Sequence, residues 1–226
     1  MKEGPPIAQI AALIGDPARA NMLGALMSGK ALTATELANE AQITRQTAST
    51  HLKKLTEGQL LVQRHQGRHR YYALANEEVA LTLAGLMGLA DLTGQSRTRT
   101  GPKDEALRTA RACYNHLAGE KGVWLYESLC KQGHLDHKDG TLYLTDNGRA
   151  FALTFGIDVD KLENKSSALC RECLDWSARR SHLAGTLGRA FLTRFEEIGW
   201  VHRAPKSRAI IFTPRGNREF ANHFPL

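Results

Sequence analysis

The stretch Ile43-Thr-Arg-Gln-Thr-Ala-Ser-Thr-His-Leu-Lys-Lys-Leu-Thr-Glu-Gly58 decides the fold of the N-terminal part of the chain. Its apolar residues Ala48, Leu52 and Leu55 recur at the spacing i, i+4, i+7, which predicts a helix with one buried face. The other face is polar or basic, and no carboxylate precedes Glu57 on it. That face carries Arg45, Gln46, Thr47, Ser49, Thr50, Lys53 and Lys54, with Thr44 at the start of the helix. The helix is therefore expected to pack by one side and to offer a cationic side to a partner.

The segments on either side of this helix add two further helices and a β-hairpin. Asp16-Pro17 predicts an earlier helix, because aspartate caps free N–H groups and proline suits the first helical position. Thr33-Ala-Thr-Glu36 has the pattern of a capping box and predicts the helix that precedes Ile43. Residues 60–65 and 69–74 are typical of two strands around a turn. The predicted fold class is mainly α with small β-hairpins (α+β), led by a winged helix-turn-helix.

Positive charge is concentrated in the same part of the chain. The chain has 30 Lys and Arg against 23 Asp and Glu, a formal net charge of +7. Between Thr44 and Tyr72 the sequence has six Lys or Arg and one acidic residue, a net charge of +5. Arg64, Arg68 and Arg70 belong to the expected hairpin. Such a surface suits double-stranded DNA, since basic side chains neutralise phosphates and a polar helix can enter the major groove.

Three motifs in this region resemble the ArsR/SmtB family of winged-helix regulators. They are Ile14-Gly-Asp-Pro-Ala-Arg19, Thr35-Glu-Leu-Ala38 and Thr44-Arg-Gln-Thr-Ala-Ser-Thr-His-Leu-Lys-Lys-Leu55, and the resemblance covers about residues 7–90. The resemblance implies a transcriptional repressor that binds a palindromic operator as a homodimer and leaves it when a small effector binds. The family's familiar metal sites are not expected, because residues 36–42 lack Cys and His and residues 76–92 lack His.

The length of the chain fits one large or two small domains, and the polar, glycine-containing segment at 93–103 predicts a linker between two. Residues 76–92 are apolar on more than one face, and we interpret them as a dimerisation helix, because such a helix needs a partner. The predicted organisation is a DNA-binding and dimerisation domain at 1–92, a linker at 93–106 and an effector-sensing domain at 107–226.

The second half contains an internal repeat. Residues 133–151 and 199–220 share one order of glycine, strand, turn, strand, Thr-x-x-Gly and helix. This order predicts one or two further winged-helix-like units in the C-terminal domain. Two unrelated hairpins are the alternative interpretation.

The second half also carries a candidate sensing site made of Cys113, His116, Cys170, Cys173 and His182. Cys170 and Cys173 are three residues apart, and on a helix this spacing puts both sulfurs on one side. Together with the pair Cys113 and His116, they can form a tetrahedral site for zinc or another thiophilic metal. A thiol–disulfide switch between Cys170 and Cys173 is a second interpretation. Packing of buried thiols, with no cofactor, is a third.

Composition narrows the classes of protein that the sequence favours. The start of the chain has no apolar h-region, and no stretch approaches the roughly 18 apolar residues of a membrane span. Four cysteines are too few for a secreted disulfide scaffold, so we expect a cytoplasmic protein. The rival function is a thiol- or metal-dependent oxidoreductase using Cys170 and Cys173. It is disfavoured because no strand is predicted before the CxxC motif, so we expect no enzyme.

Overall fold

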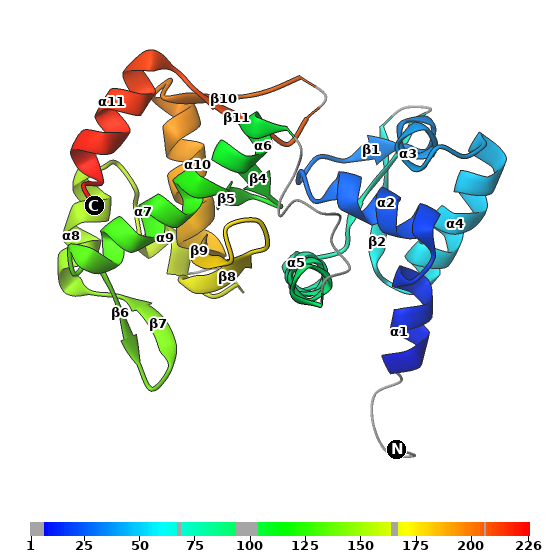
Figure 1. The fold of residues 1–226 in the computed structure, drawn as a ribbon, viewed down its shortest axis with the longest axis horizontal. Helices are drawn as coiled ribbons and strands as arrows, with labels where there is room; N and C mark the ends of the chain where they lie inside the picture. The colour runs from blue at the N-terminus through cyan, green and yellow to red at the C-terminus, as the bar shows by residue number, and fades with distance from the viewer. Residues whose placement is uncertain (1–6, 67–68, 94–103, 164–166, 206) are drawn as a thin grey trace. The chain divides into compact units, whose positions relative to one another are not determined.

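The computed structural model describes residues 7–66, 69–93, 104–163, 167–205 and 207–226 (Figure 1). They belong to two compact units, Met1–Leu83 and Ala84–Leu226. The division falls inside helix α5 (Glu77–Leu92), earlier than the boundary expected at residue 92. Within these described ranges, no helix combines the length and the apolar character that crossing a bilayer requires.

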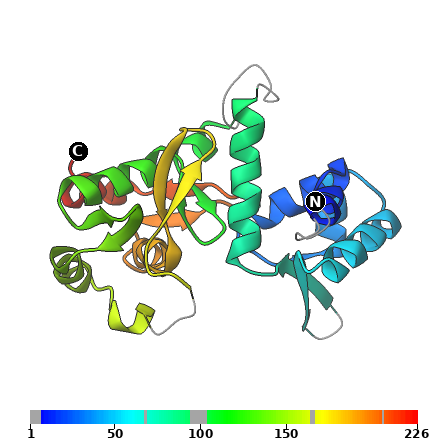
Figure 2. The ribbon, with the colours of Figure 1, turned by 90° about the horizontal axis from the view of Figure 1, so that it is seen from below.

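The first unit combines a helical core with a three-stranded antiparallel sheet. Its elements are α1 (Ile7–Ile14), α2 (Pro17–Leu26), β1 (Leu32–Thr33), α3 (Ala34–Ala41), α4 (Arg45–Glu57), β2 (Leu61–Gln66) and β3 (His69–Leu74), followed by the start of α5. The strand order is β1-β3-β2, with Leu32 opposite Tyr72 in one pair and Arg64 opposite Tyr71 in the other. The β2–β3 hairpin projects from the helices as a wing (Figure 2). The predicted winged helix-turn-helix is confirmed.

Capping interactions explain where the helices of the first unit begin. The Thr33 hydroxyl accepts the N–H of Glu36, and the Glu36 carboxylate accepts the N–H of Thr33 at 2.7 Å, which completes the predicted capping box. Asp16 accepts the N–H of Arg19 at 2.9 Å and starts α2. The Arg19 side chain then donates to two carbonyls in the last turn of α1, at 2.6 and 2.7 Å. These bonds satisfy carbonyls that a helix end leaves free.

The inner side of α4 forms the centre of the first unit's core. Ala48, Leu52 and Leu55 each have an exposed fraction of 0%, and α4 contacts both α2 and α3. Burying each leucine stabilises the unit by roughly 1.5–3 kcal/mol relative to an exposed side chain. The face predicted to be buried is therefore buried, and it fixes which side of α4 remains accessible.

The second unit consists of two similar halves. The first half comprises β4 (Arg111–Cys113), β5 (His116–Ala118), α7 (Glu120–Lys131), β6 (Leu135–Lys138), β7 (Thr141–Leu144) and α8 (Asp146–Thr154). The second comprises β8 (Arg171–Asp175), β9 (Arg180–Ala184), α10 (Gly185–Glu197), β10 (Val201–Arg203), β11 (Ile210–Phe212) and α11 (Pro214–His223). The short helix α6 (Glu105–Thr109) precedes the first half. A second short helix, α9 (Asp160–Glu163), lies between the two halves. Each half runs hairpin, helix, hairpin, helix.

The two copies of the predicted repeat use the same hydrogen bonds. The hydroxyls of Thr145 and Thr213 accept the N–H groups of Gly148 and Gly216, at 3.0 and 2.9 Å, and so begin α8 and α11. A Cβ atom on either glycine would overlap a carbonyl oxygen of the segment before the hairpin. Both helices therefore approach the backbone so closely that only glycine fits. This equivalence favours a true repeat over two unrelated hairpins.

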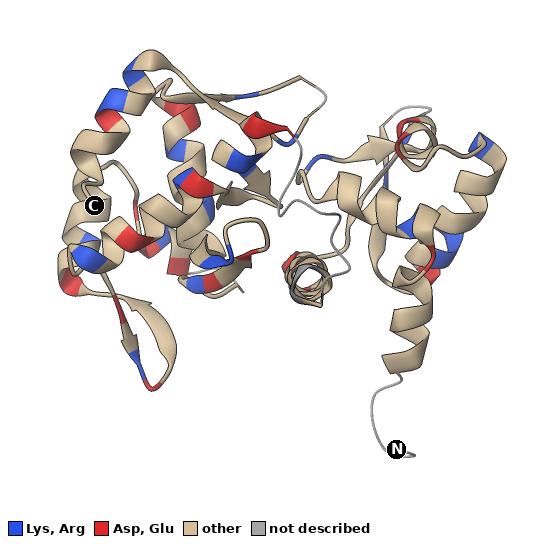
Figure 3. Ribbon diagram, viewed as in Figure 1, with Lys and Arg blue, Asp and Glu red and all other residues tan. Residues whose placement is uncertain are grey.

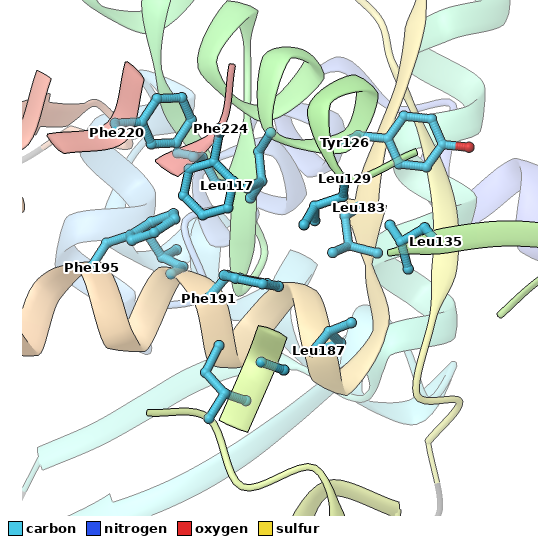
Figure 4. Packing of buried hydrophobic residues seen from close by; sticks show 14 of the residues in the cluster. Leu117, Tyr126, Leu129, Leu135, Leu183, Leu187, Phe191, Phe195, Phe220 and Phe224 are labelled. Carbon is cyan, nitrogen blue, oxygen red and sulfur yellow. The ribbon is translucent and has the colours of Figure 1, made fainter. Parts of the chain in front are cut away.

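Helix α10 lies at the centre of the second unit's core (Figure 4). Its residues Phe191 and Phe195 are buried and pack against Phe220 and Phe224 near the C-terminus. The Phe195 and Phe220 ring centroids are 5.7 Å apart in an edge-to-face arrangement, and those of Phe191 and Phe224 are 5.9 Å apart. Such aromatic pairs add about 0.5–1.5 kcal/mol each beyond their buried area. Leu117 of the first half belongs to the same buried cluster, so the two halves share one core.

The prediction of a helix around Cys170 and Cys173 is wrong. Arg171–Asp175 forms strand β8, in which buried and exposed residues alternate. Asp175 ends the strand, because its carboxylate accepts the N–H groups of Ser177 and Ala178 at 3.0 and 2.8 Å. Cys170 precedes the strand and belongs to the hydrophobic core cluster, which does not include Cys173. The two cysteines of the CxxC motif therefore do not share a side.

Candidate functional site

The outer side of α4 is a continuous exposed surface. All the polar and basic residues predicted on it are exposed: Thr44, Arg45, Gln46, Thr47, Ser49, Thr50, Lys53 and Lys54. Lys53 lies 3.8 Å from the Glu57 carboxylate, whereas Arg45 and Lys54 pair with no carboxylate in the part of the chain that the structure describes. Figure 3 shows basic segments near both ends of α4. This surface, the α4 face, therefore carries uncompensated positive charge.

Thr44 has a structural task that the sequence pattern did not assign to it. Its hydroxyl accepts the N–H of Thr47 at 3.2 Å and lies 2.8 Å from the Thr47 hydroxyl, which makes it the N-cap of α4. A cap of this kind holds the first turn of the helix and so fixes the direction of Arg45 and Gln46.

We expect Thr44→Ala to destabilise the first turn of α4 by about 1 kcal/mol, because the N–H of Thr47 loses its acceptor. Hydrogen exchange of peptides covering residues 44–57 measures the opening free energy of this helix. Thr44→Ser keeps the hydroxyl and is the matched control, for which wild-type protection is expected. Equal exchange in the alanine and serine variants would show that the cap does not hold the helix.

The wing places further cations beside the α4 face. Arg64 on β2 and Arg70 on β3 are exposed, and Arg68 lies outside the described residues. A hollow of about 630 Å³ is lined by Thr33, Ala34, Thr35, Arg45, Ser49, Arg70, Tyr71 and Tyr72. Because Arg45 of α4 and Arg70 of the wing both line it, two elements contribute positive charge to one concave surface. A backbone of phosphates is a fitting ligand for such a surface.

The second candidate site is a buried cluster of two cysteines and two histidines. Cys113 on β4 is paired with His116 on β5, and Cys173 on β8 is paired with His182 on β9. All four residues are buried, with exposed fractions of 9% or less. One ligand atom from each of them lies within 4.8 Å of all the others. We call these four residues the Cys/His cluster. Each hairpin supplies one cysteine and one histidine to it.

The sequence around the two histidines explains why the hairpins can meet. His116 and His182 each begin the segment His-Leu-Ala-Gly, and each is followed by a further glycine, Gly122 or Gly188, on the next helix. A Cβ atom on Gly122 would lie 3.6 Å from the Cβ of His182, and one on Gly188 would lie 3.3 Å from the Cβ of His116. The small residues let each helix approach the histidine of the other half. The repeated pattern His-Leu-Ala-Gly-x-x-Gly is the sequence signal from which this pairing of histidines could have been predicted.

A buried ion pair that the sequence did not predict lies beside the cluster. Arg111 Nη2 is 2.7 Å from Asp175 Oδ2, which also accepts the N–H of Gly119 at 2.7 Å. Burial alone raises the pKa of Asp175, but the charge of Arg111 and the N–H donors of Ala178 and Gly119 outweigh it and lower this pKa to about 2. Asp175 is therefore a charged carboxylate that ties β8 to β4 and to the start of α7.

The thiols and imidazoles of the Cys/His cluster influence one another. A hydrogen bond with Cys173 and the two neighbouring imidazoles lower the pKa of Cys113 well below its ordinary value. The same contact and burial raise the pKa of Cys173. Burial lowers the pKa of His182, which favours its neutral form. These shifts favour the thiolate form of Cys113 and the thiol form of Cys173.

Cys170 stands apart from the cluster. It is one of the buried residues of the hydrophobic core, and burial raises its pKa to about 12. A thiol with such a pKa is a poor nucleophile at neutral pH. Of the five candidate sensing residues, the structure brings four together and places Cys170 among apolar side chains.

A winged helix-turn-helix with an exposed cationic helix and a basic wing defines a DNA-binding transcriptional regulator. Residues 14–64 match a family model described as a helix-turn-helix domain. Over 219 residues the chain is 42% identical to YdfF, an uncharacterized HTH-type transcriptional regulator of Bacillus subtilis, and the match covers 97% of both chains. The chain belongs to this family of helix-turn-helix transcriptional regulators.

Solved structures of regulators are similar to part of the chain. A homodimeric winged helix-turn-helix DNA-binding domain from Mycobacterium bovis, described as a possible ArsR-family regulator, is 27% identical and has a TM-score of 0.36. That match covers 38% of this chain and 78% of the other. The cadmium sensor CmtR from Mycobacterium tuberculosis is 34% identical over 35% of this chain and 81% of its own, with a TM-score of 0.32.

Proposed function

We propose that this regulator is a repressor in the cytoplasm that binds a palindromic operator as a homodimer and leaves it when an effector binds. The observation that carries the DNA-binding part is the α4 face, which is exposed and without carboxylates up to Glu57, next to a basic wing. A recognition helix needs these properties, because acidic side chains would repel phosphates on entering the major groove.

The residues of this surface divide into two groups by their chemistry. Arg45 can offer two donors to a guanine edge, and Gln46 can pair with adenine through its amide. Both stand in the first turn of α4, where recognition helices contact bases. Thr44, Thr47, Ser49, Thr50, Lys53, Lys54, Arg64, Arg68 and Arg70 suit phosphates or base edges. In this proposal the first group carries the sequence preference, and the second carries most of the affinity.

Helix α5 supports the proposed homodimer. Leu86 and Leu89 on this helix have exposed fractions of 41% and 56%. Exposed leucines repeated on one helix are costly in water and are covered favourably by the same helix of a second copy. A palindromic operator then follows, because two-fold symmetry of the protein calls for two equal half-sites. In this proposal the effector binds the second unit, at the Cys/His cluster or elsewhere.

We expect the affinity for duplex DNA to fall steeply with salt, because binding releases cations from the phosphates. If about 6–10 phosphates are contacted, affinity falls by roughly 10³–10⁵ between 50 and 200 mM salt. Fluorescence anisotropy of a labelled duplex at several salt concentrations measures the slope. Lys53→Ala is expected to reduce this slope by about 1 per protomer.

The matched control for this experiment is Lys161→Ala in the second unit. Lys161 is exposed and pairs with Asp158 at 2.7 Å, far from α4 in the sequence. Its removal is expected to leave the slope unchanged. Affinity that is independent of salt, or a slope that Lys161→Ala reduces as much as Lys53→Ala, would contradict the proposed surface.

A further inference from the structure

We propose that Cys113, His116, Cys173 and His182 bind one divalent closed-shell cation, Zn²⁺ or one of like chemistry such as Cd²⁺, in a tetrahedral site joining the two halves of the second unit. Each half supplies one thiolate and one imidazole from a single hairpin. The proposal concerns the second unit alone and stands whether or not the proposed repressor function holds.

The donor set selects the class of cation. Thiolate and imidazole are the ligands of zinc, whereas Mg²⁺ and Ca²⁺ take oxygen ligands. Binding releases the protons of both thiols, so two thiolates and two neutral imidazoles surround a cation of charge +2. The charges then cancel within the site, which suits a place where all four ligands are buried. A monovalent cation would leave the same buried site with a net negative charge.

The distances agree with tetrahedral coordination. With zinc bonds of about 2.0–2.1 Å to nitrogen and 2.3 Å to sulfur, two nitrogens lie about 3.3 Å apart and two sulfurs about 3.8 Å apart. The Nε2 atoms of His116 and His182 are 3.1 Å apart. The largest separation within the cluster is no more than 4.8 Å. Shifts of about 1 Å or less therefore bring all four ligand atoms to bonding distance.

The surroundings of the cluster favour ligand binding over simple packing. Nε2 of His116 and Nε2 of His182 face each other 3.1 Å apart inside the core, beside the thiols of Cys113 and Cys173. Polar groups in a core are normally bound by partners, and a shared cation would bind both of these nitrogens and both sulfurs. Cys170 needs no such explanation, since it lies among apolar side chains. All four ligands come from the protein, which is typical of structural rather than catalytic zinc sites.

The strands carrying the ligands are held in place by groups outside the site. The Arg111–Asp175 ion pair joins β4 to β8, two residues from Cys113 and Cys173. Hairpin pairing sets Cys113 opposite His116 and Cys173 opposite His182. The ligands are thus positioned by the fold, and binding requires little reorganisation.

Cobalt(II) titration of the full chain, stripped with a chelator and kept reduced, tests the proposal. We expect one equivalent to produce the intense ligand-field bands of tetrahedral cobalt and a sulfur-to-cobalt charge-transfer band, with Zn²⁺ then displacing Co²⁺. Cys113→Ser and His182→Gln are expected to lose these bands. Cys130→Ala and Cys170→Ala are matched controls expected to keep them, because neither thiol belongs to the cluster.

Two measurements on the unmodified sequence keep the test independent of whether a variant folds. Zn²⁺ is expected to protect two thiols from alkylation, and peptide mapping should identify them as Cys113 and Cys173. Zn²⁺ is also expected to raise the unfolding temperature of the wild type, because it binds the folded state. Protection of Cys130 or Cys170 instead, octahedral cobalt spectra, or a Cys113–Cys173 disulfide that persists in reductant would each overturn the proposal.

Discussion

Replacing Asp175 with alanine is expected to destabilise the second unit by about 3–5 kcal/mol, because it leaves the Arg111 guanidinium buried without its partner. The two side chains have exposed fractions of only 2% and 0%. The N–H of Gly119 loses its acceptor in the same change, which adds to the cost. Tryptophan fluorescence during urea unfolding measures the effect selectively, since all three tryptophans of the chain lie in the second unit.

Two further variants separate the ion pair from general sensitivity to mutation. Lys161→Ala removes an exposed ion pair with Asp158, 2.7 Å long, and is expected to have little effect on stability because solvent screens such pairs. Arg111→Met combined with Asp175→Leu removes both charges and is expected to be less destabilising than Asp175→Ala alone. If Asp175→Ala and Lys161→Ala have equal effects, the buried pair does not stabilise the unit as described.

Arg45→Ala is expected to weaken binding of the operator by about 2–6 kcal/mol, because each bidentate arginine–guanine contact discriminates by about 1–3 kcal/mol and a dimer makes two. This corresponds to a loss of roughly 30-fold to 20,000-fold in affinity. The operator is obtained by selection from a pool of random duplexes. Anisotropy titrations against this operator and its single-base variants then measure affinity and preference together. Loss of preference at one guanine in each half-site is the expected signature.

Lys54→Ala is the matched comparison on the same helix. Lys54 is exposed one turn before the end of α4, where its charge reaches phosphates more readily than bases. We expect it to weaken all duplexes by a similar factor and to leave the ratio between operator and variants unchanged. A uniform loss in the Arg45→Ala protein would remove Arg45 from base recognition.

The first unit was predictable because its signals are local. The spacing of Ala48, Leu52 and Leu55 identifies the buried face of α4 within eight residues, and Thr33 and Glu36 form the expected cap three residues apart. The polar side of α4 follows from the apolar side by geometry alone. Among these features of α3 and α4, only the role of Thr44 as the N-cap of α4 was not predicted from the sequence pattern.

The second unit was harder to predict because its decisive contacts are distant in sequence. His116 and His182 meet across 66 residues, and Arg111 meets Asp175 across 64. The CxxC spacing suggested a pair of adjacent sulfurs, but a short strand cannot be told from a turn of helix by spacing alone. The alternation of buried and exposed residues in Arg171–Asp175 reflects the strand. The thiol that lies near Cys173 is Cys113, which belongs to the β4–β5 hairpin of the other half.

The repeated His-Leu-Ala-Gly segments make reciprocal contacts, because Gly122 approaches His182 and Gly188 approaches His116. Each half therefore carries half of a symmetric structure, as the subunits of a homodimer do. A chain containing one half alone would carry one cysteine and one histidine of the cluster, and two copies of it would bring together two of each. This arrangement is what duplication and fusion of an ancestral gene segment would leave behind.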